Sequence, residues 1–247
     1  MPERSPSPSD PADLREHHQI GAMAVLTVLA GAIDAISFLT LGHIFTALAT
    51  GNLLFLAFTL TGNGHVPAAR PAIAIAAFVV GVVTGSLFTR RLFARRRGWF
   101  PAALTAEAVL LAAAGALALW RHGTRSLNDE EDYLVIAIVG LAMGLRADAV
   151  LRARVPGMPT LLMQMSLIQL MHDLSSGAGR DIPAGERRTA RIRLVSTIAG
   201  IFVGGLLGAL MVPWGSGRAL LTVAAGVLLV ACAYVLLPRC RARTAAG

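Results

Sequence analysis

Six stretches of mostly apolar residues, each long enough to cross a lipid bilayer, dominate the 247-residue chain. A spanning helix needs about 20 predominantly apolar residues, because the hydrocarbon core is about 30 Å thick and a helix rises about 1.5 Å per residue. The six stretches are Ile20 to Leu41, Pro71 to Phe88, Pro101 to Trp120, Tyr133 to Leu151, Ile192 to Pro213 and Ala219 to Leu237. Inside a bilayer the backbone groups of a single segment bond only as a helix. The expected fold class is therefore an all-α polytopic membrane helix bundle.

Two further apolar stretches, Ile44 to Leu60 and Thr160 to Leu174, are shorter and have polar residues near their middles. They are predicted to be re-entrant or broken segments that do not cross the membrane. The composition agrees with a membrane protein, since only 15% of the residues are charged and the mean hydropathy is +0.65. An average soluble domain has roughly 25% charged residues.

The arginines predict the orientation, because cytoplasmic loops carry an excess of basic residues. The net charge of +8 comes from short bursts of arginine between the spans, which argues for orientation signals and against nucleic-acid binding. The densest bursts, together with the basic C-terminus, are expected inside: Arg90, Arg91, Arg95, Arg96 and Arg97; Arg180, Arg187, Arg188, Arg191 and Arg193; and Arg239, Arg241 and Arg243. The acidic loop around Asp129 fits outside. A bacterial inner (plasma) membrane protein with both termini in the cytoplasm is expected.

The chain also divides into two similar halves, residues 20–120 and 133–237, each predicted to be a membrane repeat. Residues 1–19, rich in proline and serine, are expected to be a disordered cytoplasmic tail without the apolar core of a signal peptide, and residues 238–247 a cytoplasmic C-terminal tail. Ala77, Gly81 and Gly85 match Gly200, Gly204 and Gly208, and small residues at this spacing let helices approach closely. Three crossings per half make the repeat inverted, an arrangement found in many secondary transporters.

A polar centre is predicted from one ionisable residue and two polar breaks. Asp34 lies within the first apolar stretch, close to the small residues Gly31 and Ala35, so that it is expected to face protein. It is either a ligand- or proton-binding group or a structural carboxylate that accepts hydrogen bonds from Thr or Asn. The first break, Thr50, Gly51 and Asn52, and the second, Gln164 and Ser166, are candidates for binding a solute or ion. Alternatively, their side chains only satisfy backbone groups at a turn.

Three other charged residues fall within predicted spans. Glu107 is a candidate for proton coupling together with Asp34, but it is also placed to stay near the inner headgroups and pair with the cluster at Arg95 to Arg97. Arg146 and Asp148 are interpreted as anchors at the membrane interface, close to Arg152.

No motif in the sequence indicates enzyme activity. Catalytic motifs, phosphate-binding loops and dinucleotide fingerprints do not occur. The histidines and the two cysteines, Cys232 and Cys240, lack the spacing of metal ligands. We therefore expect no enzyme activity, no metal and no cofactor. The expected partners are the bilayer, a small solute or ion and, where the helices self-associate, a second copy of the chain in a homo-oligomer.

From Gln19 to Leu237 the chain resembles the YoaK family of uncharacterised bacterial inner-membrane proteins. The resemblance rests on Gly31, Asp34, Ala35, Phe45, Thr50-Gly51-Asn52 and, in the second half, Met143-Gly144-Leu145. Two positions depart from the family pattern, which has Gln or Asn in place of Arg146 and a Thr-Gly pair in place of Gln164-Met165. The resemblance implies a membrane location and no particular activity.

The sequence as a whole favours translocation of a small solute or ion, with coupling to protons as one mechanism. A scaffold or partner-binding membrane protein, whose arginine clusters contact anionic lipid or an acidic partner, is the main alternative. A membrane-embedded enzyme acting on lipid is the third.

Overall fold

The described part of the chain, residues 11–94, 98–124, 129–153, 167, 168, 171 and 184–236 of a computed structural model, is helical wherever it is regular. The elements are α1 (Pro11–Thr40), α2 (Ala49–Leu60), α3 (Ala69–Ala94), α4 (Trp99–Thr124), α5 (Asp129–Ala153), α7 (Ala184–Met211), a 3₁₀ turn η1 (Val212–Trp214) and α8 (Ser216–Leu236). Six of the helices are long and apolar enough to span a membrane, and each overlaps one of the six predicted spans. The all-α polytopic fold class is therefore confirmed.

The first helix begins earlier than expected. α1 starts at Pro11, so that residues 11–19, which we expected to belong to a disordered tail, are helical. Proline is well suited to the first position of a helix, because its fixed φ matches the helix and its missing N–H would have no partner there. The residues that follow, from Asp13 to Glu16, include good helix formers.

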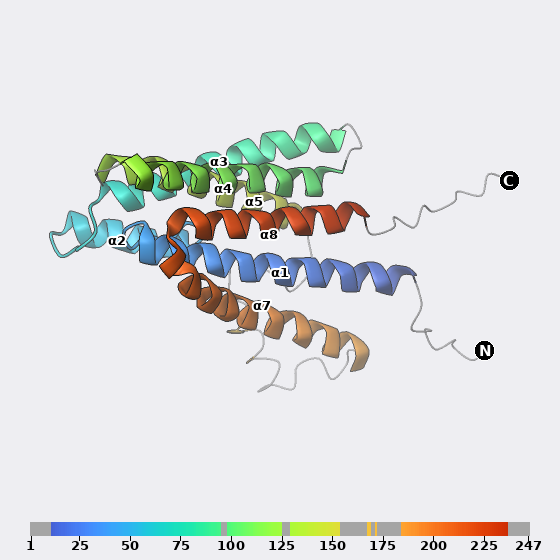
Figure 1. Ribbon diagram of the computed structural model, residues 1–247. Helices are drawn as coiled ribbons and strands as arrows, with labels where there is room; N and C mark the ends of the chain where they lie inside the picture. The colour runs from blue at the N-terminus through green and yellow to red at the C-terminus, as the bar shows by residue number, and fades with distance from the viewer. Residues whose placement is uncertain are drawn as a thin grey trace, which may run out of the picture.

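The six long helices alternate in direction (Figure 1). We call the end of the bundle where α1 begins the N-end, and the opposite end, which carries α2, the α2 end. α1, α4 and α7 run from the N-end to the α2 end, and α3, α5 and α8 run back. The chain from α1 to α3, including α2, thus leaves and returns at the α2 end. The first short segment does not cross, as predicted, whereas the second lies mostly outside the described residues.

Three pairs of helices make the closest approaches, and glycines line all three contacts. α1 packs on α7, α3 on α5 and α4 on α8. At Gly204 of α7, an added Cβ atom would lie 2.8 Å from the carbonyl carbon of Val28 and 3.0 Å from the nitrogen of Ala32, both on α1. Gly115 of α4 and Gly217 of α8 meet in the same manner. Close packing of backbones is a common basis of helix association in lipid, where no hydrophobic force acts between helices.

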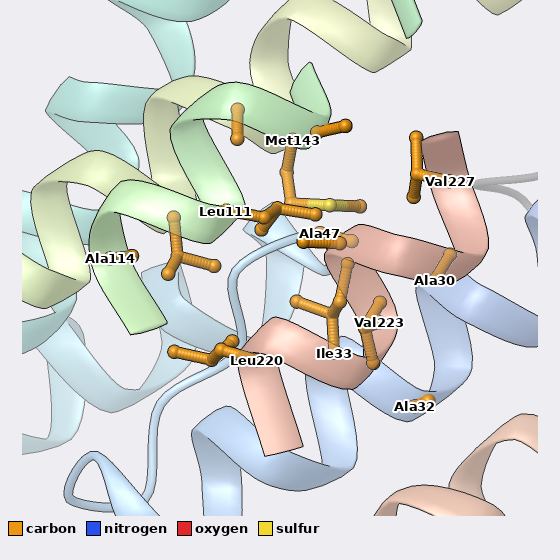
Figure 2. Close-up of a cluster of buried hydrophobic side chains, with 14 of the residues drawn as sticks. Ala30, Ala32, Ile33, Ala47, Leu111, Ala114, Met143, Leu220, Val223 and Val227 are labelled. Atoms are coloured by element: carbon orange, nitrogen blue, oxygen red, sulfur yellow. The ribbon is translucent and has the colours of Figure 1, made fainter. Parts of the chain in front are cut away.

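The centre of the bundle is filled by apolar side chains from α1, α4, α5 and α8 (Figure 2). Ile33, Leu111, Met143 and Val223 contribute from these four helices and are almost completely buried. Ala47, from the segment between α1 and α2, lies among them. A non-helical stretch of chain therefore reaches the core of the bundle, and the residues that hold it there define the site described next.

Candidate functional site

The chain turns back into the bundle directly after α1. Gly42 and His43 have φ values of 89° and 62°, and the His43 N–H donates to the Phe38 carbonyl over 3.1 Å. This is the hydrogen bond of a Schellman motif, in which glycine takes the left-handed position that ends a helix. Three of the residues that follow are buried, namely Ile44, which is fully inaccessible, Thr46, which is 2% exposed, and Ala47. The segment from Gly42 to Leu48 is thus the descending arm of a re-entrant hairpin whose ascending arm is α2.

Asp34 holds this descending arm. Its Oδ1 atom accepts hydrogen bonds from the backbone N–H groups of Thr46 (2.9 Å) and Ala47 (2.8 Å), and a longer one from the Thr46 hydroxyl (3.5 Å). The Thr46 hydroxyl also lies 3.3 Å from that of Ser37. Asp34 faces protein, as predicted, and is 8% exposed. Asp34 lies about 9 Å before the end of α1. The chain that leaves α1 therefore turns back by about that distance to reach Asp34.

Asn52 binds the same arm from the other side. Its Oδ1 atom accepts from the Phe45 N–H over 2.9 Å, while its Nδ2 atom donates to the Phe45 carbonyl. Gly51 is needed next to it, because an added Cβ atom would lie 2.8 Å from the Phe45 ring. The Phe45 ring packs in a cluster with Phe38 of α1 and Phe55 of α2, with centroids 5.0 and 6.0 Å away. Asp34 and Asn52 together satisfy backbone groups that have no helix or sheet partner, which non-helical backbone at this depth requires.

Replacing Asn52 with alanine is expected to loosen the arm and to lower the free energy of unfolding by about 1–3 kcal/mol, since two backbone groups of Phe45, both only partly buried, lose their partners. Hydrogen–deuterium exchange of the peptide containing Phe45 to Ala47 should accelerate. The neighbouring Thr50 is exposed and serves as the control. Equal exchange in Asn52→Ala and Thr50→Ala proteins would contradict this role of Asn52.

The predicted polar centre is only partly assembled in the described structure. Asp34 and Asn52 meet on the descending arm, and Gly51 packs beside them. The prediction of a break in the helix at Thr50, Gly51 and Asn52 is wrong, because these residues form the first turn of α2 and the chain is non-helical just before them, at residues 41–48. Thr50 does not join them, because α2 turns it outward and leaves it exposed. Gln164 and Ser166 lie outside the described residues.

Arg146 and Glu107 form a second polar site, in the core of the bundle. Arg146 Nη2 makes an ion pair with Glu107 Oε1, and Arg146 Nη1 donates to the Leu26 carbonyl of α1 over 3.1 Å. The Arg146 side chain is 1% exposed, and that of Glu107 is fully buried. The prediction that Arg146 anchors at the membrane interface is therefore wrong, as is the pairing of Glu107 with Arg95 to Arg97. The two residues are about 10 Å from the end of α5 and about 12 Å from the start of α4, too deep for either role.

Asp148 fits its prediction better. It accepts from Arg152 Nε over 2.9 Å and from the Thr89 hydroxyl over 2.9 Å, and Arg152 Nη2 donates to the Ser86 hydroxyl. The predicted contact with Arg152 is confirmed, and these bonds join α5 to α3 near the N-end. Asp148 itself is 5% exposed.

These features define a class: a multi-pass helical membrane protein with a re-entrant hairpin and a buried ion pair. The chain belongs to the family described as "Protein of unknown function (DUF1275)", whose model matches residues 22–234. It is 26% identical over 156 residues to the "UPF0700 transmembrane protein YoaK" of Bacillus subtilis (strain 168), an alignment that covers 62% of this chain and 66% of that relative. The expected YoaK-like family is thus confirmed. No solved structure matches.

Four of the residues that carry the family resemblance in the first half build the hairpin. Asp34, Phe45, Gly51 and Asn52 contact one another or the same stretch of backbone, and Gly31 packs against α7. Sequence reasoning missed the pairing of Arg146 with Glu107. The signal was present, since an arginine and a carboxylate inside two apolar spans are costly unless they are paired.

Proposed function

We propose that this protein moves a small solute or ion across the bacterial inner membrane, using two inverted repeats and a polar centre between them. The observation that carries the proposal is that the chain places non-helical backbone and charged side chains in the core of the bundle, where a water-soluble substrate would have to pass. Non-helical segments that meet charged groups at membrane depth are typical of the binding sites of secondary transporters.

The inverted repeat is supported by the contacts of two helix pairs. On α1, an added Cβ atom at Gly31 would lie 2.5 Å from the Ile201 carbonyl oxygen and 3.2 Å from the Gly205 nitrogen of α7. On α5, Gly144 approaches the Phe78 carbonyl oxygen and the Val82 nitrogen of α3. Gly200, Gly204 and Gly208 face α1 in the register in which Ala77, Gly81 and Gly85 face α5. Each half therefore contributes one helix to each pair, in matching register and with opposite direction.

The charges do not follow this register. Counted from Gly31 and Gly144, Asp34 corresponds to Ala147, and Arg146 corresponds to Ile33. The proposed repeats thus share their packing and differ in their polar residues. We infer that the two halves have separate roles: the first holds the re-entrant hairpin through Asp34, and the second provides a cation, Arg146.

Reconstitution in liposomes tests translocation. Vesicles loaded with a pH-sensitive dye or, in parallel, with dyes specific for the ion tested, then exposed to gradients of sodium, potassium, chloride and small organic ions, should show a flux above that of protein-free vesicles. If the flux is unchanged in the Asp34→Asn protein, the charge of Asp34 has no part in translocation, although translocation itself is supported. If the folded protein supports no flux of any probe, the scaffold function is favoured instead.

Both termini are proposed to be cytoplasmic, because the arginine-rich ends of α3 and α7 both lie at the N-end. In a background lacking Cys232 and Cys240, cysteines at Ala153 and Ala184, where α5 ends and α7 begins, should resist an impermeant maleimide in intact cells and react after permeabilisation. A cysteine at the exposed His65, between α2 and α3, should react in intact cells. Labelling of only one of Ala153 and Ala184 from outside would mean that the second short segment crosses, which removes the inverted repeat.

A further inference from the structure

The ion pair between Arg146 and Glu107 leaves hydrogen-bonding capacity unused. Within the described part of the chain, Arg146 Nε and Glu107 Oε2 have no hydrogen-bond partner, although both atoms are buried. Nearby turns of α4 and α5 contribute buried apolar residues to the core, among them Leu104, Leu111 and Met143. Buried polar groups are nearly always satisfied, so an unsatisfied guanidinium and carboxylate at one place indicate a site that binds something in addition to its own two members.

Only one member of the pair is able to lose its charge. The arginine guanidinium stays protonated in proteins, whereas a carboxylate becomes neutral when it takes up a proton. A cation that displaced Arg146 from Glu107 would leave the guanidinium buried and unpaired, which costs several kcal/mol. Protonation of Glu107 instead frees Arg146 for an anion. The geometry therefore favours an anionic ligand that enters together with a proton.

We propose that Arg146 binds a monovalent carboxylate and that Glu107 carries the coupled proton. The guanidinium fork matches the planar carboxylate group, and one of its nitrogens, Nη2, already contacts the Glu107 carboxylate. In the exchange, a proton binds Glu107, its ion pair with Arg146 breaks, and the incoming carboxylate takes its place on Arg146. One positive and one negative charge enter together, so the site keeps its net charge. A doubly charged anion would leave an uncompensated charge in the core. This inference deepens the proposed translocation function and rests on it.

Among the residues that the structure describes, few other ionisable groups lie on the helices packed around Glu107. Arg146 of α5 is its partner, and Asp34 of α1 also interacts electrostatically with that guanidinium. On α8, which packs along α4, the single charged residue is Arg218 near the helix start at the α2 end, and Tyr234 lies near the other end against Phe100. Asp148 is engaged by Arg152 and Thr89. Glu107 is thus the carboxylate that forms a direct ion pair with Arg146.

Acetate is the probe, and the thermal unfolding midpoint of the full-length protein in detergent is the first measurement, with sodium chloride at the same ionic strength as the reference. In the unmodified protein, sodium acetate should raise Tm more at mildly acidic than at mildly alkaline pH. Glu107→Gln removes the competing carboxylate, so acetate should bind at least about tenfold more tightly at neutral pH, without the pH dependence. The double variant Glu107→Gln/Arg146→Gln removes both charges of the pair and should be folded yet insensitive to acetate.

A second measurement needs no variant. Acetate added to the unmodified protein in weakly buffered detergent solution should cause the uptake of about one proton for each acetate bound. If Glu107→Gln responds to acetate no more than the double variant, or if acetate binds without proton uptake, the carboxylate site is wrong and the pair is a structural link between α4, α5 and α1. These results are independent of flux: transport of another ion without an acetate response would overturn only this inference, whereas acetate binding without any flux would overturn only translocation.

Discussion

Replacing Gly204 with alanine is expected to be among the most damaging single changes in this protein. The added Cβ atom would overlap the Val28 carbonyl group and lie 3.0 Å from the Ala32 nitrogen, so that α7 would have to move away from α1 along the whole contact. Overpacking in a well-packed core typically costs about 1–3 kcal/mol. Because the obstacle here is backbone, which cannot change rotamer, we expect about 3 kcal/mol or more. Unfolding in mixed micelles with increasing sodium dodecyl sulfate measures the loss.

The adjacent Gly205 provides a matched control. A Cβ atom at Gly205 would meet nothing within 4 Å, although the residue is on the same helix. Gly205→Ala should therefore leave stability within about 1 kcal/mol of the unmodified protein, or raise it slightly, because alanine is a better helix former. Gly144→Ala, on the α3–α5 contact, should behave like Gly204→Ala. Equal stability of the Gly204→Ala and Gly205→Ala proteins would show that the close approach of α1 and α7 is not required.

Removal of the Asp34 side chain is expected to have the second large effect. Asp34→Ala leaves the N–H groups of Thr46 and Ala47 without their acceptor in the bundle core. Each unsatisfied buried donor costs about 1–3 kcal/mol, so the two together should lower the free energy of unfolding by about 2–6 kcal/mol. The same denaturant titration measures this loss, and faster hydrogen exchange between Phe45 and Leu48 should locate it on the descending arm.

Asp34→Asn separates the hydrogen bonds from the charge. Both backbone donors bind Oδ1, and asparagine retains an oxygen at that position, so the variant should remain folded and lose only the added strength of a charged acceptor. A flux that fails in Asp34→Asn while stability is kept would assign Asp34 a part in ion binding. If Asp34→Ala is as stable as Asp34→Asn, the carboxylate does not hold the hairpin.

Only some features of the hairpin can be predicted from single residues in the sequence. Asp34 was expected to face protein, and it does, as expected for an ionisable group in an apolar environment. Gly51 was expected to allow a non-helical backbone, but it is helical within α2, and the non-helical stretch lies before it, at residues 41–48. The sequence does not show which of the two polar side chains, Thr50 or Asn52, binds the descending arm. The two residues are two positions apart, and only the rotation of α2 against α1 and α3 decides that Asn52 is buried at 2% exposure and that Thr50 is exposed.

The sequence alone determined the six spans, the non-crossing first short segment and the small-residue faces of α3 and α7, because these depend on length, apolarity and spacing along one helix. Tertiary structure decided which helices pair and which charges meet. Arg146 and Glu107 are far apart in sequence, on different helices, and each alone was consistent with a place near the headgroups. The packing of α4, α5 and α1 brings them together in the core. Burial then makes the pairing obligatory, because neither charge is stable there alone.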